Sequence, residues 1–392
     1  MTRSRKPLEG RREFLAAAGA AAAAPWIARG RIARFGQTTY SVRCLDLMRQ
    51  ALVVDMLSPL TIRQSTWAGW ARRPESLSAD VAARYRSSGI SVFHTAVGWG
   101  GPDAYLDALK FFMGHNALIA GRDDLFIRID SAADLARVKA TGKIGLLLGA
   151  QNSDHFVKPG LDPKDLLGTV DEFYGYGQRV SQLTYNTLTW FGSGATDRGD
   201  PGLSELGVEL VARMNKVGMA IDTSHCGDRT TLDAFAASTK PVLVTHSNAR
   251  ALAAGHPRCK PDEVIRAVGK AESVFGITGV RNFVTDREPT TIEHFLDHVD
   301  YIARMIGVEH VGIGSDIDLD GYDDLSAAEQ AATKASYSAS YRFRDKLDID
   351  EIAHPKRMFD VTEGLIRRRY SDDQILGILG GNFQRVLGQI WI

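Results

Sequence analysis

Eight short apolar runs recur along the chain, and longer amphipathic segments separate them. Most of the runs are apolar throughout, which is typical of parallel strands that are covered on both faces. In residues 203–218, one of the separating segments, Leu206, Leu210 and Met214 recur at helical spacing. Strand and helix alternating eight times predicts an α/β fold, a TIM-type (β/α)8 barrel. The runs begin at Ala51, Gly89, Lys143, Arg179, Gly218, Pro241, Ser273 and His310.

The first 30 residues differ from the rest of the chain. Arg11 and Arg12 stand shortly before an alanine- and glycine-rich run that is much shorter than the roughly 20 residues needed to cross a bilayer. This order predicts a twin-arginine export signal over residues 1–30, with its cleavage site left open. We therefore expect a periplasmic or otherwise exported protein that uses the twin-arginine (Tat) export machinery.

The remainder, residues 40–392, is expected to form a single barrel domain with additional C-terminal helices from Leu347 packed on its outside. No segment after the signal is apolar enough to cross a membrane. Lys plus Arg and Asp plus Glu both number 47, so no basic field is available for a nucleic acid partner. Three cysteines are too few for a disulfide scaffold, and free thiols are favoured, with Cys226 and Cys259 as the pair to test for a bridge.

Polar side chains gather at the carboxyl ends of several apolar runs. Asp222 and His225 end one run, His246 ends the next, and Asp316 ends the last. These ends surround the active site of a barrel of this type, so we expect the side chains to share one mouth. Histidine and carboxylate groups are ligands for zinc or a similar divalent metal. His225, His246 and Asp316 are therefore candidate ligands, Asp55 and Asp222 are further candidates, and Asp316 is alternatively a proton shuttle.

Four other residues near the strand ends are candidates for contact with a substrate. Arg250 follows His246 by four residues and could hold a carboxylate through two hydrogen bonds. Tyr185 is a candidate catalytic residue that could donate a hydrogen bond to an oxyanion. A purely structural role for Tyr185, packed at the rim of the barrel, is an equal alternative. The neutral amides Gln151 and Asn186 are poor ligands for a zinc-like ion and are candidates for substrate binding.

Four stretches carry a resemblance to a known family. They are "GLSELGVELVARMNKVGMAIDTSHCGDRTTLDAF", "KPVLVTHSNARALAAGHPR", "HVGIGSDIDLDG" and "DDQILGILGGNFQRVL". In these stretches the chain resembles the membrane (renal) dipeptidase family, peptidase family M19, among the amidohydrolase-like barrels. The resemblance implies a two-zinc dipeptidase, and a homodimer, in which His225 and His246 bind one metal. It also implies that Arg250 contacts the substrate carboxylate and that Asp316 lies across the mouth.

The chain departs from the family pattern in three places. Leu57 and Pro59 occupy the positions where the family's first strand supplies a histidine and an aspartate, and only Asp55 remains. The metal-bridging glutamate appears as Gln151, and the histidine implied to stabilise the transition state appears as Tyr185. A neutral Gln151 would leave the repulsion between two dications uncompensated. We therefore expect one ion rather than two, in a divergent exported bacterial branch of the family.

Two classes of function remain open at this point. The first is a metal-dependent hydrolase that cleaves a dipeptide or a similar small amide with a free carboxylate outside the cytoplasm. The alternative is a non-hydrolytic binding or accessory protein, or a protein that tailors a siderophore-type peptide, using the same barrel mouth. The metal content of the purified chain distinguishes the hydrolase from the accessory protein. The sequence is also compatible with a chain that binds no metal.

Overall fold

A ring of parallel strands forms the centre of the protein in a computed structural model, which describes residues 39–160, 165–337 and 339–391. Eight strands pair in the order β1-β2-β4-β5-β6-β7-β8-β9, and β3 pairs with the first half of β4. The strands are β1 (Val54–Asp55), β2 (Val92–Val97), β3 (Phe126–Arg128), β4 (Ile144–Ala150), β5 (Gln178–Gln182), β6 (Ala220–Asp222), β7 (Val242–Ser247), β8 (Phe275–Ile277) and β9 (Val311–Ile313).

The first and last strands meet through backbone hydrogen bonds. Met56 N–H donates to the Ile313 carbonyl at 2.9 Å, and Asp316 N–H donates to the Leu57 carbonyl at 2.7 Å. These contacts bring the two edges of the sheet together. The predicted TIM-type barrel is confirmed, and all eight apolar runs contribute one of the strands in the ring.

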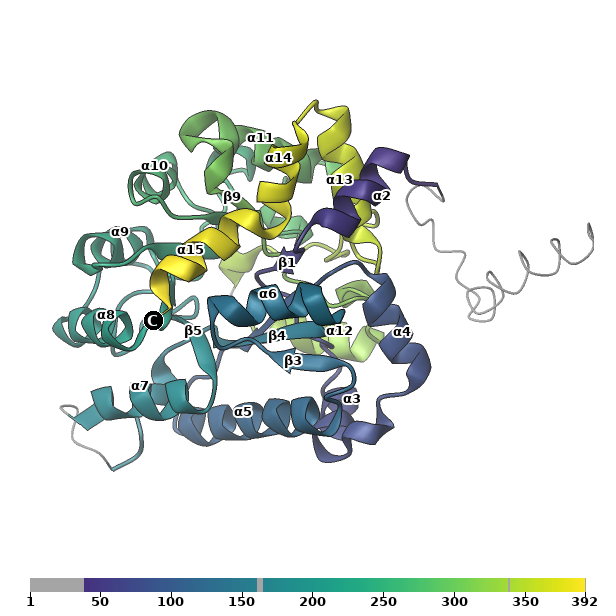
Figure 1. The fold of residues 1–392 in the computed structure, drawn as a ribbon. Helices are drawn as coiled ribbons and strands as arrows, with labels where there is room; N and C mark the ends of the chain where they lie inside the picture. Colours follow the sequence, from purple (N-terminus) through teal and green to yellow (C-terminus); the bar gives the residue numbers. More distant parts are fainter. Residues whose placement is uncertain (1–38, 161–164, 338, 392) are drawn as a thin grey trace, which may run out of the picture. The chain divides into compact units, whose positions relative to one another are not determined.

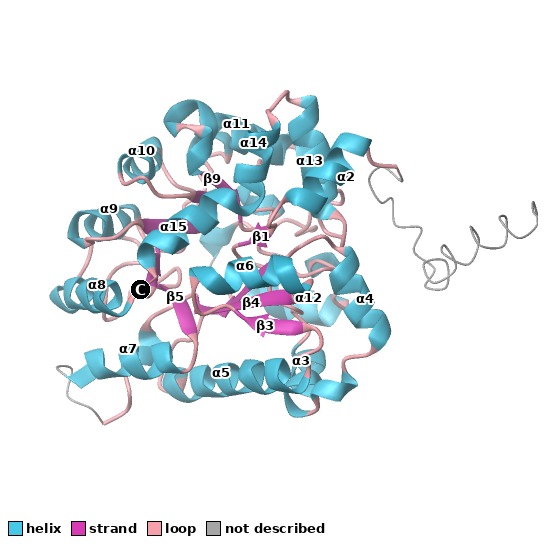
Figure 2. Ribbon diagram, in the orientation of Figure 1, coloured by secondary structure: helices cyan, strands magenta, loops and turns pink. Residues whose placement is uncertain are grey.

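Helices follow the strands and surround them (Figures 1 and 2). They are α2 (Val42–Gln50), α3 (Gln64–Arg72), α4 (Ala79–Ser87), α5 (Ala104–Gly121), α6 (Ala132–Thr141), α7 (Leu166–Gly175), α8 (Glu205–Val217), α9 (Asp228–Ala237), α10 (Asp262–Lys270), α11 (Ile292–Ile306), α12 (Ala327–Ala335), α13 (Arg357–Arg367), α14 (Asp372–Leu376) and α15 (Asn382–Ile390). Helix α8 confirms the prediction for residues 203–218: the Ser204 side chain caps its start, and Gly218, with φ of 80°, ends it.

The C-terminal helices were expected to pack on the outside of the barrel. The last of them, α15, instead closes one end of it. In Figure 1, α15 crosses in front of the strands. Phe383 from α15 is fully buried in one apolar cluster with Val92 and Leu147 of the strands. A Cβ atom on Gly312 would lie 2.3 Å from the Phe383 ring, so glycine is required in β9 for this approach. The predicted C-terminal helices are present, and the tail also serves as a plug for the barrel.

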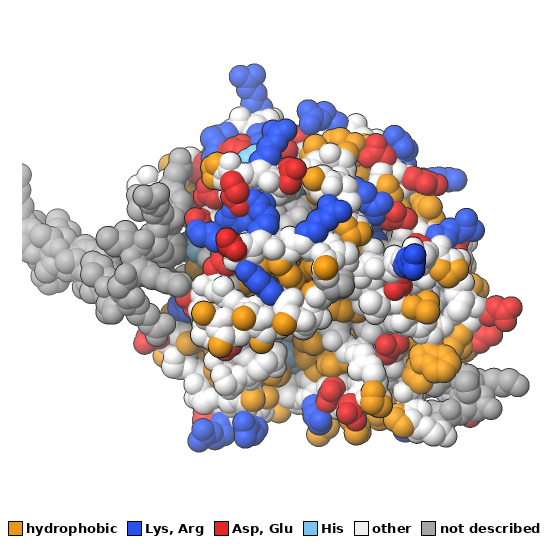
Figure 3. All heavy atoms as spheres, turned by 180° about the vertical axis from the view of Figure 1, so that it is seen from behind, with side chains coloured by type: hydrophobic (Ala, Val, Ile, Leu, Met, Phe, Trp, Pro, Cys, Tyr) orange, Lys and Arg blue, Asp and Glu red, His pale blue; other side chains and the backbone are white. Residues whose placement is uncertain are grey.

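Three further features bear on the expectations from sequence. Cys44, Cys226 and Cys259 are buried free thiols, so Cys226 and Cys259 are not bridged. Within the described residues, no helix is both long and apolar enough to span a membrane. Figure 3 shows acidic and basic side chains intermixed over the face opposite to that of Figure 1. The predicted export signal over residues 1–30 lies outside the described residues.

Candidate active site

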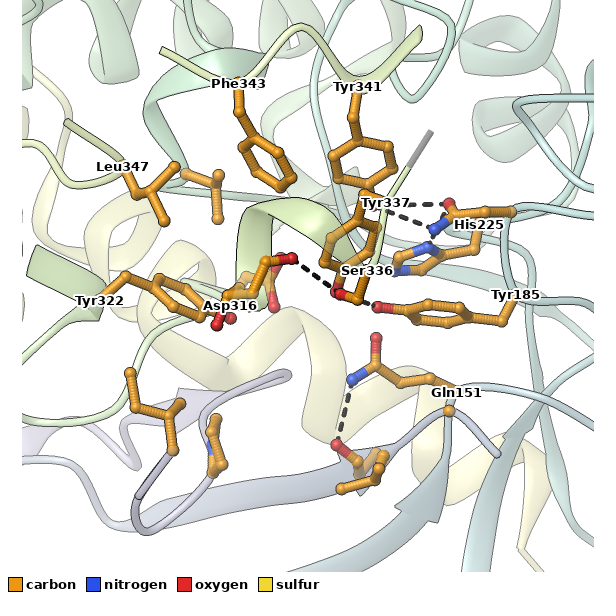
Figure 4. Close-up of a pocket in the computed structure, with 18 of the residues that line it drawn as sticks. Gln151, Tyr185, His225, Asp316, Tyr322, Ser336, Tyr337, Tyr341, Phe343 and Leu347 are labelled. Carbon is orange, nitrogen blue, oxygen red and sulfur yellow. Dashed lines mark hydrogen bonds between the residues drawn. The ribbon is translucent and has the colours of Figure 1, made fainter. Parts of the chain in front are cut away.

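A cavity of about 530 Å³ opens at the carboxyl ends of the strands (Figure 4). Five of the predicted site residues line it: Gln151 follows β4, Tyr185 and Asn186 follow β5, His225 follows β6, and Asp316 follows β9. The (β/α)8 architecture positions them, because each side chain comes from the loop directly after a strand.

His225, which lines the cavity, meets His246, which does not line it. Their Nε2 atoms are 3.0 Å apart, and both side chains are buried. Burial lowers the pKa of both imidazoles well below the ordinary value, and the neighbouring Arg258 cation lowers the two pKa values further. Both rings are therefore neutral at physiological pH, with a single proton each.

Hydrogen bonds to Nδ1 orient the two rings. His225 Nδ1 lies 2.7 Å from Asn186 Oδ1, and His246 Nδ1 lies 2.8 Å from Thr245 Oγ1. Thr245 Oγ1 donates its own proton to Asp222 Oδ2 at 2.6 Å, so it accepts from His246. With Nδ1 protonated in both rings, two Nε2 lone pairs face each other and repel unless a cation lies beside them. Outward Nδ1 bonds of this kind are typical of metal-binding histidines.

A second arrangement of protons fits the same atoms. Arg258 Nε lies 3.1 Å from His225 Nδ1. If Arg258 donates to this nitrogen, the His225 proton resides on Nε2 and is directed at His246. The pair can therefore hold either one proton in a direct hydrogen bond or one cation.

Asp222 and Asp55, the two further ligand candidates, are occupied by the protein itself. Asp222 Oδ1 accepts from Ser224 Oγ at 2.6 Å and from Thr245 N–H at 2.9 Å, in addition to the bond to Oδ2. Asp55 accepts from Ser315 Oγ at 2.6 Å and forms a fully buried ion pair with Arg357 at 3.1 Å. Asp222 thus supports His246 through Thr245, and Asp55 joins β1 to helix α13.

Of the metal-ligand candidates predicted from sequence, the structure brings two imidazole donors together, those of His225 and His246. Leu57 and Pro59 provide no ligand atoms, and Gln151 donates from Nε2 to the Ala96 carbonyl at 3.0 Å. In the part of the chain that the structure describes, no group of three or more His, Cys, Asp or Glu side chains can hold a metal ion. An ion here would take two imidazole nitrogens, from His225 and His246, and would rely on water or substrate for its other ligands.

The structure does not bring Arg250 to the cavity. Its guanidinium forms a bidentate ion pair with Asp228, at 2.6 and 2.7 Å, and does not line the cavity. The guanidinium near the histidines belongs to Arg258, which is 1% exposed and also donates to the carbonyl groups of Ser224 and His246. Arg258 is the last residue of the stretch "KPVLVTHSNARALAAGHPR", and it was not among the residues predicted for the site.

Asp316 lies at the cavity in an unusual backbone conformation. Its φ of 63° is in the left-handed region, which a non-glycine residue adopts at an energetic cost. Burial raises the pKa of this carboxyl to about 7, and Arg258 offsets part of the effect. Among the described residues, no side chain or backbone group is hydrogen-bonded to its carboxylate. Asp316 is therefore suited to taking up and releasing a proton near neutral pH.

An aromatic wall of the cavity was missed by the sequence reasoning. It comes from residues 322–347, which follow β9 and include helix α12. Tyr337 Oη lies 2.7 Å from Tyr185 Oη, and Tyr341 Oη accepts from Asn186 Nδ2 at 3.2 Å. The only signal in the sequence is the tyrosine-rich run "YSASYRF" over 337–343, which has no strand end to mark it as part of the site.

Comparisons with known proteins agree with this fold. A family model described as membrane dipeptidase, peptidase family M19, matches residues 46–333. Dipeptidase verJ of Clonostachys rogersoniana is 32% identical over 235 residues, 57% of this chain and 58% of that protein. An uncharacterized dipeptidase of Schizosaccharomyces pombe is 33% identical over 200 residues, 48% of this chain and 45% of that protein. The chain thus spans about half the length of these relatives.

Solved structures show the same architecture. An amidohydrolase from Pseudomonas aeruginosa superposes with a TM-score of 0.75 and 26% identity, over 89% of this chain and 99% of that one. The probable dipeptidase PvdM from the same organism shares the fold, with a TM-score of 0.71 and 18% identity, over 88% of this chain and 97% of that one. Because the family model matches most of the barrel, including both histidines, this chain belongs to peptidase family M19, the membrane dipeptidase family.

Proposed function

We propose that the protein is a dipeptidase-like hydrolase that cleaves a dipeptide or a similar small amide with one metal ion, zinc or a similar divalent metal. The observation that carries this proposal is the facing pair of His225 and His246, whose Nε2 atoms are 3.0 Å apart and whose Nδ1 atoms are held from outside. The replacement of the other family ligands by Leu57, Pro59 and Gln151 supports one ion rather than two.

The described residues divide the work of the reaction among them. A bound ion would lower the pKa of a water molecule and polarise the scissile carbonyl. Tyr185 and Tyr337 share one hydrogen bond, so one of their two O–H groups remains free to donate to the developing oxyanion. Asp316, with its pKa of about 7, takes up a proton and returns it to the leaving nitrogen. Gln151 and Asn186 are at the cavity wall, where their amides can contact the substrate.

Metal content and turnover of the purified chain test this proposal together. We expect about one ion per chain when the protein is purified without chelators, and loss of both the ion and dipeptide hydrolysis in His225→Ala and His246→Ala. His294→Gln is the matched control, because His294 lies in the first turn of α11 and not at the cavity. Undiminished hydrolysis by the chelated wild type would contradict a metal-dependent reaction.

A binding or accessory role is the second candidate. It is favoured because, within the described residues, the site offers two imidazole donors and no group of three metal-binding side chains, whereas catalytic zinc ordinarily has three protein ligands. Absence of bound metal after zinc is offered back, together with measurable binding of small ligands in the cavity, would favour this role over hydrolysis.

The site of action and the assembly state belong to the same proposal. Residues 1–30 direct export through the Tat machinery, and the mature chain acts in the periplasm or otherwise outside the cytoplasm. The twin arginine before a short apolar run supports this. The homodimer implied by the family resemblance is tested by light scattering on the purified chain.

A further inference from the structure

We propose that the cavity selects dipeptides whose C-terminal residue has a large apolar side chain, and that Phe343 and Leu347, with the neighbouring rings of the aromatic wall, contact that side chain. The inference names the substrate class of the proposed hydrolase and therefore rests on the proposed function. The residues that carry this specificity are separate from the groups that take part in the proposed reaction.

The cavity has a polar side and an apolar side. Gln151, Tyr185 and His225, which follow strands, lie on one side of the space in Figure 4. Phe343 and Leu347 lie on the other side and have no polar atom in their side chains. A substrate that fills the cavity therefore meets hydrogen-bonding groups at one end and hydrocarbon at the other.

The tyrosines of the aromatic wall direct their hydroxyl groups toward the polar side. Tyr337 Oη lies 2.7 Å from Tyr185 Oη, and Tyr341 Oη lies 3.2 Å from Asn186 Nδ2. The rings of Tyr337 and Tyr341 stack with centroids 4.5 Å apart, and Phe343 lies 5.2 and 5.1 Å from these two centroids. Because both hydroxyl groups are engaged at the polar side, the wall offers mainly ring carbon to the rest of the cavity.

Hydrogen bonds to the barrel hold this wall in place without a ligand. The Tyr341 carbonyl accepts from Asn282 Nδ2 at 3.0 Å. Leu347 N–H donates to Asp323 Oδ1 at 3.0 Å, and Arg281 N–H donates to the Leu347 carbonyl at 2.9 Å. A surface that is already ordered loses little entropy on binding, so more of the gain from apolar contact appears as affinity.

The position of Asp316 assigns the apolar side to the C-terminal residue of the substrate. In the proposed reaction Asp316 returns a proton to the leaving nitrogen, which is the amine of the C-terminal residue. Figure 4 shows Asp316 on the side of Tyr322 and Leu347, whereas Tyr185 and His225 lie opposite. We therefore expect the side chain next to this nitrogen to extend toward the apolar side.

Four dipeptides test this specificity through kcat/KM. Leucine and asparagine have similar shapes and differ in polarity, so Ala-Leu and Ala-Asn isolate the effect of an apolar C-terminal side chain. We expect Ala-Leu to be cleaved at least about tenfold more efficiently, because an apolar pocket does not replace the hydrogen bonds that the asparagine amide makes with water. The reversed pair, Leu-Ala and Asn-Ala, is the control for position and should differ much less.

The C-terminal residue is supplied in both its L and D forms, and the ratio is taken for the form that is cleaved faster. Equal kcat/KM for Ala-Leu and Ala-Asn, or a leucine preference confined to the reversed pair, would overturn the proposal.

Reduced-amide analogues, in which CH2–NH replaces the scissile amide, test the same preference without turnover. Isothermal titration calorimetry on the purified chain gives their dissociation constants. We expect the Ala-Leu analogue to bind about tenfold more tightly than the Ala-Asn analogue. Equal binding of the two analogues, or no binding of either, would overturn the proposal.

Variants assign the preference to the aromatic wall. Phe343→Asn places a polar group on the apolar side and should lower the ratio of Ala-Leu to Ala-Asn several-fold, whereas Phe343→Leu should retain most of it. Tyr176→Asn, at an aromatic position that is 41% exposed and outside the cavity lining, is the control and should retain the full ratio. Thermal melting confirms that each variant is folded. An unchanged ratio in folded Phe343→Asn would overturn the role of Phe343.

Failure of this inference and failure of the proposed function give different results. Hydrolysis of all four dipeptides with equal efficiency retains the hydrolase and overturns the specificity. Tighter binding of the Ala-Leu analogue by a chain that hydrolyses none of the dipeptides retains the specificity of the cavity and overturns the hydrolase.

Discussion

At the scale of single residues, the site depends on side chains that orient other side chains. Asn186 is the clearest case, because its Oδ1 lies 2.7 Å from His225 Nδ1 while its Nδ2 donates to Tyr341. Its φ of 64° places it in the left-handed region, where asparagine is tolerated better than most residues. The residue links the histidine pair to the aromatic wall.

Loss of the Asn186 acceptor is expected to weaken metal binding. Asn186→Ala leaves His225 Nδ1 without its acceptor, and such changes around metal ligands reduce affinity by about 10- to 100-fold. Zinc titration monitored by a competing chelator measures the change. Asn186→Asp keeps an acceptor oxygen and serves as the matched control, which should recover most of the affinity. Equal zinc affinity in Asn186→Ala and the wild type would show that Asn186 does not orient His225.

Asp316 makes stability depend on pH in a defined window. Its folded pKa of about 7 lies above the ordinary 3.8, so the folded state binds more protons than the unfolded state between these values. The free energy of unfolding therefore falls as pH rises from about 4 to 7, by at most about 4 kcal/mol from this group. Urea unfolding at several pH values should show Asp316→Asn gaining stability relative to the wild type across this window.

The comparison with a variant isolates Asp316 from other groups that titrate in the same range. Asp348 also has a pKa raised to about 7 by burial, and it contributes equally to the wild type and to Asp316→Asn. The exposed Asp123→Asn control should differ from the wild type by the same amount at every pH. A difference between Asp316→Asn and the wild type that stays constant with pH would contradict the raised pKa.

Site residues that directly follow a strand could be placed from the sequence, whereas residues whose position depends on tertiary contacts could not. The barrel brings the ends of parallel strands to one mouth, so Gln151, Tyr185 and His225 follow from the apolar runs alone. Arg250 is near His246 in sequence, but an ion pair with Asp228 of helix α9 holds its guanidinium away from the cavity. Such competition between partners depends on tertiary contacts, which a pattern of residue types does not encode.

At the scale of elements, the apolar runs predicted the ring of strands because buried parallel strands need apolar side chains on both faces. Strand β3 was not predicted, because Phe126–Arg128 is only three residues long and gives no recognisable run. Helix α15 was expected on the outside of the barrel. An amphipathic pattern shows that one face is buried, and it does not show which part of the barrel covers that face.

Phe383 is expected to be the main stabilising residue of the plug. Phe383→Ala removes a fully buried ring beneath β8 and β9 and should lower the free energy of unfolding by about 3–5 kcal/mol. Urea denaturation followed by circular dichroism measures the loss. Val42→Ala, at a position 75% exposed in α2, is the control and should change stability by less than about 0.5 kcal/mol. A loss in Phe383→Ala as small as that of the control would contradict the plug.

At the scale of the whole molecule, the export proposal makes a prediction for the chain in a bacterial host. Replacing Arg11 and Arg12 by lysine keeps the charge and removes the arginine pair, so the precursor should accumulate in the cytoplasm. Cell fractionation and immunoblotting measure the distribution. The control changes Arg3 and Arg5 to lysine and should leave export intact. Periplasmic protein at the wild-type level in the first variant would exclude this route.

The aromatic wall is a separate stretch of chain from the residues that hold the histidine pair. The histidines follow β6 and β7, whereas residues 322–347 lie between β9 and α13 and meet the strand ends through the Tyr185–Tyr337 hydrogen bond. Mutation and recombination in this one stretch can therefore change what the cavity admits while the strands and their histidines are inherited unaltered.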